Sequence, residues 1–245
     1  MARKLRVEYP GAIYHVMNRG DRREPIFKDD EDRRRFISTL GEACAKTGWQ
    51  VHALCLMANH FHLVVETPGS NLVAGMKWFL GTYTACFNRC HKVFGHLFSG
   101  RYKSLIVDGS GSGYLRAVCD YVHLNPARGR LLRPEQPLRD YPWSSWPEYL
   151  KSPGKRPEWL RVDRLLGEYR IPHDSAAGRG RLEEASGIQT HDGGRESVTV
   201  DPPWLVLWRG HAQRRVAGTS VGQGGSQALR RRVKGIGGSE SGTDR

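Results

Sequence analysis

Apolar positions in the first 150 residues recur with two periods, which predict strands and helices in turn. Alternation with period two predicts strands over residues 12–18, 49–57, 60–67 and part of 96–107. Helical spacing predicts helices over residues 29–46, 71–92 and 113–124. The first six elements follow the split βαβ order of a ferredoxin-like fold. The sequence therefore predicts an α+β domain with an antiparallel sheet and helices on one face.

The same patterns assign side chains to faces. In the second strand, one face is expected to carry Val51, Ala53, Cys55 and Met57, and the other Gln50, His52, Leu54 and Leu56. The third helix is expected to end where the pair Asn125-Pro126 follows it.

Composition changes after residue 150. Residues 151–175 suggest a short helical extension. Residues 176–245 contain 14 of the 29 glycines and few apolar residues in a periodic arrangement. Such a composition buries little surface, so this Gly/Arg-rich tail is expected to be disordered.

Charge and cysteine content narrow the classes of function. The chain has 38 basic and 25 acidic side chains, a net charge of +13, which predicts a polyanionic partner such as nucleic acid. No apolar stretch has the length of a membrane span, and no secretory signal is recognisable. Five cysteines without a C-x-x-C pair argue against a disulfide framework. A cytoplasmic location is expected.

The third strand carries the first candidate site. Residues two apart on a strand share a face, so His60 and His62 project together while Phe61 points to the opposite side. Two imidazoles on one face can bind Mn²⁺, Zn²⁺ or, less readily, Mg²⁺. The alternative is a pair of structural histidines.

The third helix carries the second candidate site. Tyr121 and Asn125 are four residues apart and therefore share a helical face. A divalent cation nearby would favour attack of a tyrosine oxygen on phosphorus, and the asparagine amide oxygen could serve as a third ligand. The alternative is a packing tyrosine followed by an asparagine that ends the helix.

These motifs together resemble a known family. His60-Phe61-His62, followed by the segment Tyr121–Arg128, is similar to the single-tyrosine transposases of the HUH superfamily, and most similar to their REP-associated branch. Three further segments resemble family motifs, namely residues 10–20, 98–103 and 141–145. The resemblance extends over residues 1–172.

The resemblance implies a mechanism. Residues 1–150 would form the catalytic domain, in which Tyr121 attacks single-stranded DNA, leaving a 5′-phosphotyrosine bond and a free 3′-hydroxyl. His60, His62 and Asn125 would bind Mg²⁺ or Mn²⁺, and the substrate would be hairpin DNA. The candidate DNA contacts are Arg3, Lys4, Arg6, Arg19, Arg22, Arg23, Arg101 and Lys103.

Several alternatives stay open at this point. The chain could be a domesticated site-specific nuclease with the same chemistry, or a catalytically silent nucleic-acid-binding module. Tyr114 is a rival nucleophile, although a packing role fits it better. The chain could act as a monomer or as a homodimer.

Overall fold

The computed structural model describes residues 6–185, which belong to one compact unit. Two of the candidate DNA contacts, Arg3 and Lys4, lie outside the described residues. So does residue range 186–245, which makes up most of the tail expected to be disordered.

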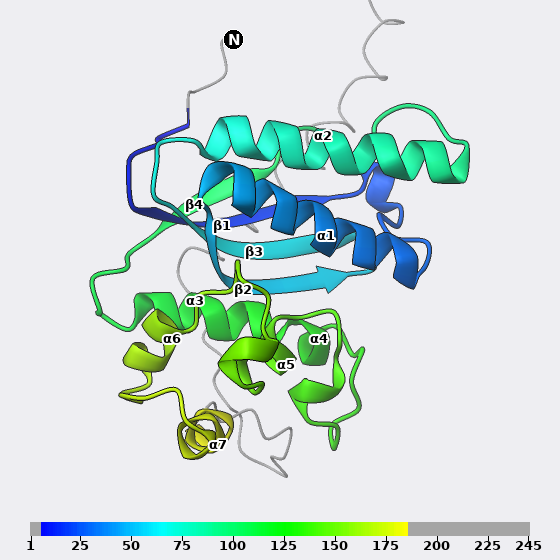
Figure 1. The fold of residues 1–245 in the computed structure, drawn as a ribbon. Helices are drawn as coiled ribbons and strands as arrows, with labels where there is room; N and C mark the ends of the chain where they lie inside the picture. The colour runs from blue at the N-terminus through cyan, green and yellow to red at the C-terminus, as the bar shows by residue number, and fades with distance from the viewer. Residues whose placement is uncertain (1–5, 186–245) are drawn as a thin grey trace, which may run out of the picture. The chain divides into compact units, whose positions relative to one another are not determined.

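A four-stranded antiparallel sheet forms the centre of the unit (Figure 1). Its strands are β1 (Ala12–Arg19), β2 (Gln50–Met57), β3 (His60–Thr67) and β4 (Lys103–Val107), arranged in the order β2-β3-β1-β4. Two long helices, α1 (Asp30–Thr47) and α2 (Leu72–His91), cover one face of this sheet. The predicted α+β, ferredoxin-like fold is confirmed.

The hydrophobic core lies between the sheet and these two helices. Helix α1 begins at an N-cap, Asp29, whose side chain accepts a hydrogen bond from the Asp32 backbone, and it ends at Gly48 with φ 73°. Phe36 of α1 packs 5.0 Å from Phe61 of β3 and 4.8 Å from Phe79 of α2, measured between ring centres. Phe61 therefore faces the helices, as its place in the strand predicts.

Strand β2 departs from the predicted alternation. Val51, Leu54 and Leu56 all belong to the helix-covered core. The register against β3 shifts between Val51 and Ala53. This β-bulge at His52 transfers the following side chains to the opposite face, so the predicted grouping of Val51 with Ala53 is wrong.

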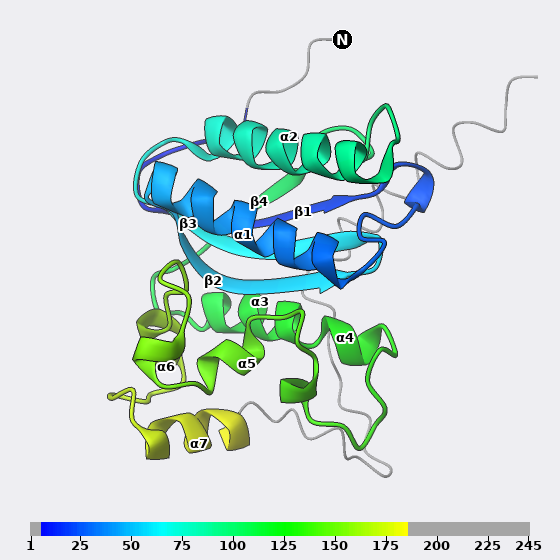
Figure 2. The same ribbon diagram turned by 45° about the vertical axis from the view of Figure 1, so that its right-hand side comes forward.

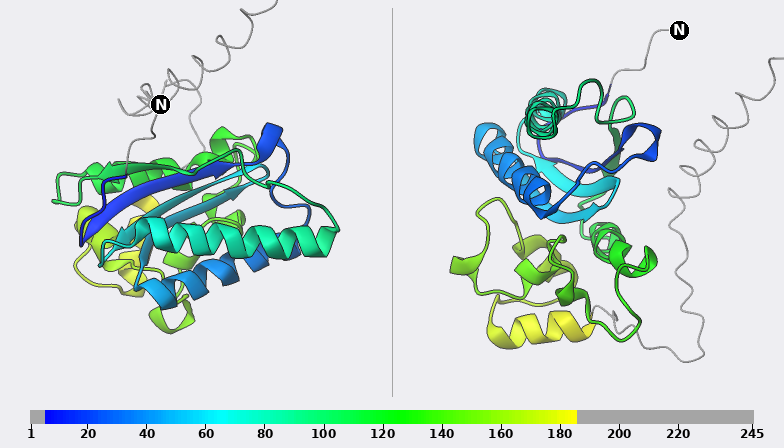
Figure 3. Two further views of the ribbon diagram at one scale, coloured as in Figure 1. Left: turned by 90° about the horizontal axis from the view of Figure 1, so that it is seen from above. Right: turned by 90° about the vertical axis from the view of Figure 1, so that its right-hand side faces the viewer.

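The C-terminal half of the unit lies on the other face of the sheet, as Figures 2 and 3 show. It contains α3 (Tyr114–His123), α4 (Asn125–Arg128), α5 (Trp146–Tyr149), α6 (Asp163–Glu168) and α7 (Ala176–Ala185). Three short 3-10 helices span Asp21–Arg23, Leu138–Asp140 and Pro153–Lys155. The chain also forms isolated bridges to the outer edge of β2, between Val51 and Leu160 and between Cys55 and Ser144.

Two predictions about this half need correction. The pair Asn125-Pro126 follows the end of α3 and also begins a further short helix, α4. Proline is tolerated in the first turn of a helix, because the N–H that it lacks would have no partner there. Residues 176–185 form α7 rather than disordered chain. Leu182 is fully buried, and burial of an apolar side chain can stabilise a helix that its composition does not favour.

No helix within residues 6–185 is long and apolar enough to cross a membrane.

Candidate active site

Two histidines of β3 lie on the sheet face that α3 covers. His60 pairs with Arg19 of β1, and His62 pairs with Met17. The ring centres of His60 and His62 are 5.2 Å apart. The structure thus brings the two imidazoles together on one face, as period-two alternation predicts.

Hydrogen bonds orient both rings. Nδ1 of His60 lies 2.8 Å from the Asn59 side-chain oxygen, and this oxygen can only accept, so Nδ1 carries the proton and Nε2 has the lone pair. Nδ1 of His62 lies 3.0 Å from Nε2 of His15, a histidine of β1. When Nδ1 of His62 donates in this bond, its Nε2 is also left with a lone pair. Such bonds to the far nitrogen are typical of histidines that bind metals.

Burial keeps these imidazoles neutral. Loss of solvation and, as a smaller cause, the nearby Arg19 charge lower the pKa of His60 to about 4. Burial also lowers the pKa of His15 to about 4 and that of His62 well below its usual value. A neutral ring is the form that can bind a cation, and these imidazoles are neutral at neutral pH.

Helix α3 places Tyr121 beside the histidines. Its ring centre lies 5.7 Å from that of His62 and 6.0 Å from that of His15, with edge contacts in both cases. On the other side, the Arg128 guanidinium lies 4.8 Å from the centre of the Tyr121 ring. This cation–π contact helps to hold the Tyr121 ring in place.

Asn125 stands at the start of α4. Its side-chain nitrogen donates to the carbonyl oxygens of Tyr121, at 3.0 Å, and Val122, at 3.2 Å. These bonds fix the orientation of the amide and leave its oxygen as the group that could coordinate a cation. A shared site of this oxygen with the two imidazoles stays a prediction, and such a set of ligands would suit Mn²⁺ better than Mg²⁺.

Several basic side chains lie near the same end of the sheet. Arg19 directly opposes His60, and its buried Nε atom has no hydrogen-bond partner within residues 6–185. Arg22 and Arg23 are exposed in the 3-10 turn after β1, and the Asn59 side chain donates to the Arg23 carbonyl at 2.9 Å. A bridge between Gly20 and Phe98 brings the chain before Arg101 to this turn.

The remaining candidates differ in position. Lys103 begins β4 and pairs with Met17, next to the histidine face. The Arg6 guanidinium stacks 3.8 Å from the centre of the Tyr102 ring and donates to the Tyr102 carbonyl. Tyr102 belongs to the helix-covered core, so Arg6 is held there rather than beside the histidines. A role of any of these side chains in DNA binding stays a prediction.

The rival tyrosine is placed elsewhere. Tyr114 begins α3, seven residues before Tyr121, which corresponds to about 10 Å along a helix axis. It lines a separate pocket with Tyr9 and Ile13, and burial raises its pKa. These surroundings suit packing.

Sequence reasoning missed two residues of the site. The strand pattern does not distinguish His15 from an ordinary strand histidine, yet His15 contacts both His62 and Tyr121. Its side chain shares a face with the histidine pair, a fact that needs the register of β1 against β3. Arg128 follows Tyr121 by seven residues across the junction of α3 and α4, a spacing that does not by itself predict a contact.

A second group of possible ligands lies at the ends of α1 and α2. Asp29, Asp32 and His91 have ligand atoms within 4.8 Å of one another. Asp32 accepts from the Lys28 backbone and lies 2.8 Å from Nε2 of His91, while Asp29 caps α1. These hydrogen bonds account for the cluster as a helix cap joined to the neighbouring helix.

The buried neutral imidazoles should make stability depend on pH. In the unfolded chain an imidazole takes up a proton near pH 6.5, whereas in the folded state burial lowers the pKa of His15 to about 4 and of His123 to about 3. The unfolded state therefore binds more protons below pH 6.5. We expect the free energy of unfolding to fall by about 1 kcal/mol or more per pH unit from pH 6.5 to pH 5.

Urea denaturation with a chelator present would measure this slope. His123→Gln is the informative variant, since it removes one buried imidazole away from the histidine pair, and it should reduce the slope. A free energy of unfolding that is constant from pH 6.5 to pH 5 would contradict the expectation.

Comparison with known proteins identifies a related family. The family model described as "Transposase IS200 like" matches residues 8–125, which include β1 to β4, α3 and Asn125. No curated protein sequence matches the chain significantly.

Two solved structures are similar to the chain. A REP-associated tyrosine transposase bound to a REP hairpin is similar with a TM-score of 0.50 and 14% identity, over 67% of this chain and 93% of that one. A transposase candidate from Deinococcus radiodurans is similar with a TM-score of 0.35 and 18% identity, over 49% of this chain and 95% of that one. From the family match and the shared fold, we conclude that residues 8–125 form a domain of the IS200-like transposase type.

Proposed function

We propose that this transposase cleaves and rejoins single-stranded DNA through a covalent bond to Tyr121. The main observation behind the proposal is the contact between Tyr121 of α3 and His62 of β3, whose ring centres are 5.7 Å apart. Phosphoryl transfer of this kind requires a nucleophile close to a bound cation. Helix α3 would supply the nucleophile, and strand β3 would supply the cation site.

In the proposed cleavage step, the phenol oxygen of Tyr121 attacks phosphorus. The phenol loses its proton, the bond from phosphorus to the 3′ oxygen breaks, and the 3′ oxygen leaves as a hydroxyl after taking up a proton. The product is a 5′-phosphotyrosine bond. Attack of a 3′-hydroxyl on this bond reverses the step, so strands can be rejoined without another energy source.

The residues at the site fit a divalent cation. His60, His62 and Asn125 would hold Mg²⁺ or Mn²⁺, since both imidazoles are neutral and the Asn125 nitrogen is already engaged by carbonyl groups. When bound, such a cation neutralises charge on the scissile phosphate. His15 orients His62 through the bond between Nε2 and Nδ1.

Two arginines would complete the surroundings of the phosphate. Arg19 lies beside His60, where its guanidinium would donate to a phosphate oxygen. Arg128 lies over the Tyr121 ring and would hold it in place through a cation–π contact. The exposed Arg22, Arg23 and Arg101 extend the basic surface beyond the site and would contact the DNA backbone.

The substrate we propose is hairpin DNA. Support comes from the structural similarity to a REP-associated tyrosine transposase bound to a REP hairpin, over 93% of that chain. The high positive charge of the chain suits a phosphate-rich partner.

Incubation of the full chain with labelled single-stranded hairpin oligonucleotides and Mn²⁺ tests the proposal. We expect a protein–DNA adduct that survives denaturation and carries the label of the 5′-phosphate side of the cut, together with a free 3′-hydroxyl fragment. Unstructured oligonucleotides of the same composition serve as the control for hairpin recognition. Cleavage that yields no covalent adduct would contradict the tyrosine mechanism.

A further inference from the structure

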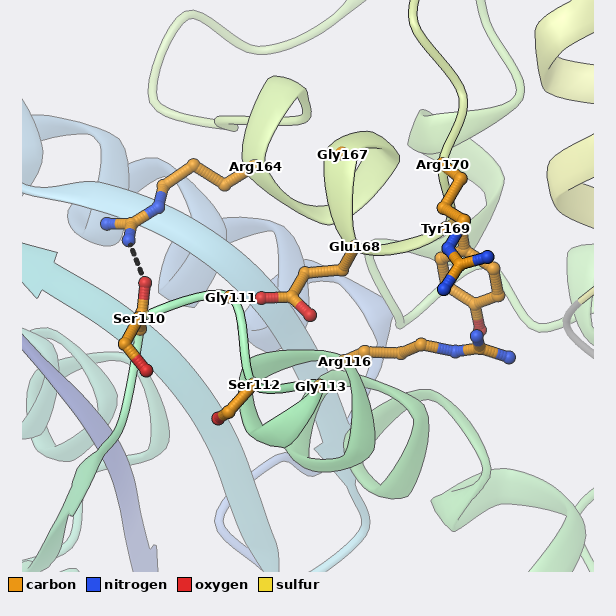
Figure 4. Close-up of a pocket in the computed structure, with 11 residues that line it drawn as sticks. Ser110, Gly111, Ser112, Gly113, Arg116, Arg164, Gly167, Glu168, Tyr169 and Arg170 are labelled. Atoms are coloured by element: carbon orange, nitrogen blue, oxygen red, sulfur yellow. Dashed lines mark hydrogen bonds between the residues drawn. The ribbon is translucent and has the colours of Figure 1, made fainter.

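The segment that follows the family domain makes close contact with the helix of Tyr121. The Tyr169 hydroxyl, just after α6, donates to the Asp120 carboxylate at 2.6 Å. The Arg116 guanidinium lies 3.9 Å from the centre of the Tyr169 ring, and its Nε is 3.6 Å from Asp120 (Figure 4). Asp120 directly precedes Tyr121, so this contact restrains α3 right beside the position of the proposed nucleophile.

The same segment also contacts the strand of the histidine pair. Arg164 of α6 donates to the Glu66 carboxylate at 2.9 Å, and Arg161 does so at 3.2 Å. Glu66 belongs to β3 and shares a face with His60 and His62, because its position differs from theirs by an even number of residues. One short segment therefore binds both elements of the proposed site.

A third contact restrains the chain before α3. Arg164 donates to the Gly109 carbonyl at 2.7 Å, the dashed line in Figure 4. The loop that follows contains Gly111 and Gly113 with φ 87° and 84°, values that glycine adopts freely. Because a glycine-rich loop restrains the following helix weakly, side-chain contacts must fix the position of α3.

Burial makes these contacts strong restraints. Tyr169 is 8% exposed, and its hydroxyl is the buried partner of a carboxylate. Burial raises the pKa of Asp120, and the Tyr169 hydrogen bond opposes this effect. A hydrogen bond to a charged group in such surroundings is among the stronger ones in proteins, and its loss leaves an acceptor without a partner.

We propose that Arg161, Arg164 and Tyr169 form a brace that holds Tyr121 in register with the histidines of β3. Tyr169 and Arg164 are thus positioning residues that act through Asp120 and Glu66. The inference rests on the proposed function, and it assigns a role to a segment that lies beyond the matched family domain.

The chain offers a matched pair of variants to test the brace. Tyr169→Phe removes the hydroxyl that binds Asp120 and keeps the ring that Arg116 contacts. Tyr141→Phe removes a hydroxyl of equal hydrogen-bond length, 2.6 Å, but this one donates to the Leu56 carbonyl of β2. Tyr141 is 9% exposed, so both variants remove a similarly buried hydroxyl.

We expect the two variants to lower the melting temperature to a similar extent but to differ in the rate of adduct formation. Tyr169→Phe should reduce the rate of adduct formation at saturating hairpin DNA about tenfold relative to Tyr141→Phe, because small displacements of a reacting group are costly. The DNA concentration for half-maximal rate should not change. Equal rates in both variants would overturn the brace.

Hydrogen exchange provides a second measurement that does not depend on activity. Tyr169→Phe should accelerate exchange of the α3 amides about tenfold while those of β2 stay protected, and Tyr141→Phe should not accelerate α3. Unchanged α3 exchange in Tyr169→Phe would overturn the brace. A wild-type chain that forms no adduct would instead refute the proposed function, and hydrogen exchange would still decide whether α3 depends on Tyr169.

Discussion

Replacing Tyr121 with phenylalanine should abolish the covalent protein–DNA adduct. The substitution removes only the phenol oxygen, and the ring can keep its contacts with His15, His62 and Arg128. Stability and hairpin binding should therefore be retained. Removal of a nucleophile that forms the covalent bond should lower adduct formation by about three orders of magnitude or more.

The control for this variant lies on the same helix. Tyr114→Phe alters the tyrosine at the start of α3, which packs near Tyr9 and Ile13. It should form adduct at nearly the wild-type rate. Denaturing gel electrophoresis with labelled DNA measures both, and an adduct that persists in Tyr121→Phe while disappearing in Tyr114→Phe would reverse the assignment.

Loss of the histidine pair is the second large expected effect. The double variant His60→Ala/His62→Ala removes both imidazoles of the proposed cation site. Its cleavage rate in Mn²⁺ should fall by about 10³-fold or more, the scale expected when the charge stabilisation of a metal ion is lost. Hairpin binding measured without metal should persist, since the basic surface is unchanged. A chelator should have the same effect on the wild-type chain.

His91 provides the matched control for the double histidine variant. It lies at the end of α2 beside Asp32, in the second group of possible ligands. His91→Gln should retain Mn²⁺-dependent cleavage, because this group does not belong to the site of Tyr121. Cleavage that survives the double variant but fails in His91→Gln would move the metal site to the other side of the sheet.

Local sequence patterns were sufficient to predict much of the fold. Period-two alternation was sufficient to place His60 and His62 on one face and Phe61 on the other, because the geometry of a strand determines this by itself. Helices α1 and α2 were similarly predictable from their apolar spacing. The β2 bulge was not, since only pairing with β3 reveals the extra residue at His52.

The site depends on contacts between residues that are distant in the sequence. Local sequence patterns cannot predict such contacts. The closeness of Tyr121 to His62 followed from a family resemblance and not from any spacing. The partnership of His15 with His62 required strand register, and the helix at residues 176–185 required burial of Leu182. Composition misled in that last case because it describes average behaviour and not a specific packing partner.

The contact between Asp120 and Tyr169 joins residues 49 positions apart, which has a consequence for the nascent protein. A chain synthesised only as far as Asn125 already contains Tyr121 and all three proposed metal ligands. The ribosome needs several more seconds to add the residues up to Tyr169, at about 5–20 residues per second. During translation, the proposed nucleophile would therefore exist before the segment proposed to position it, and competence for DNA cleavage would depend on completion of the brace.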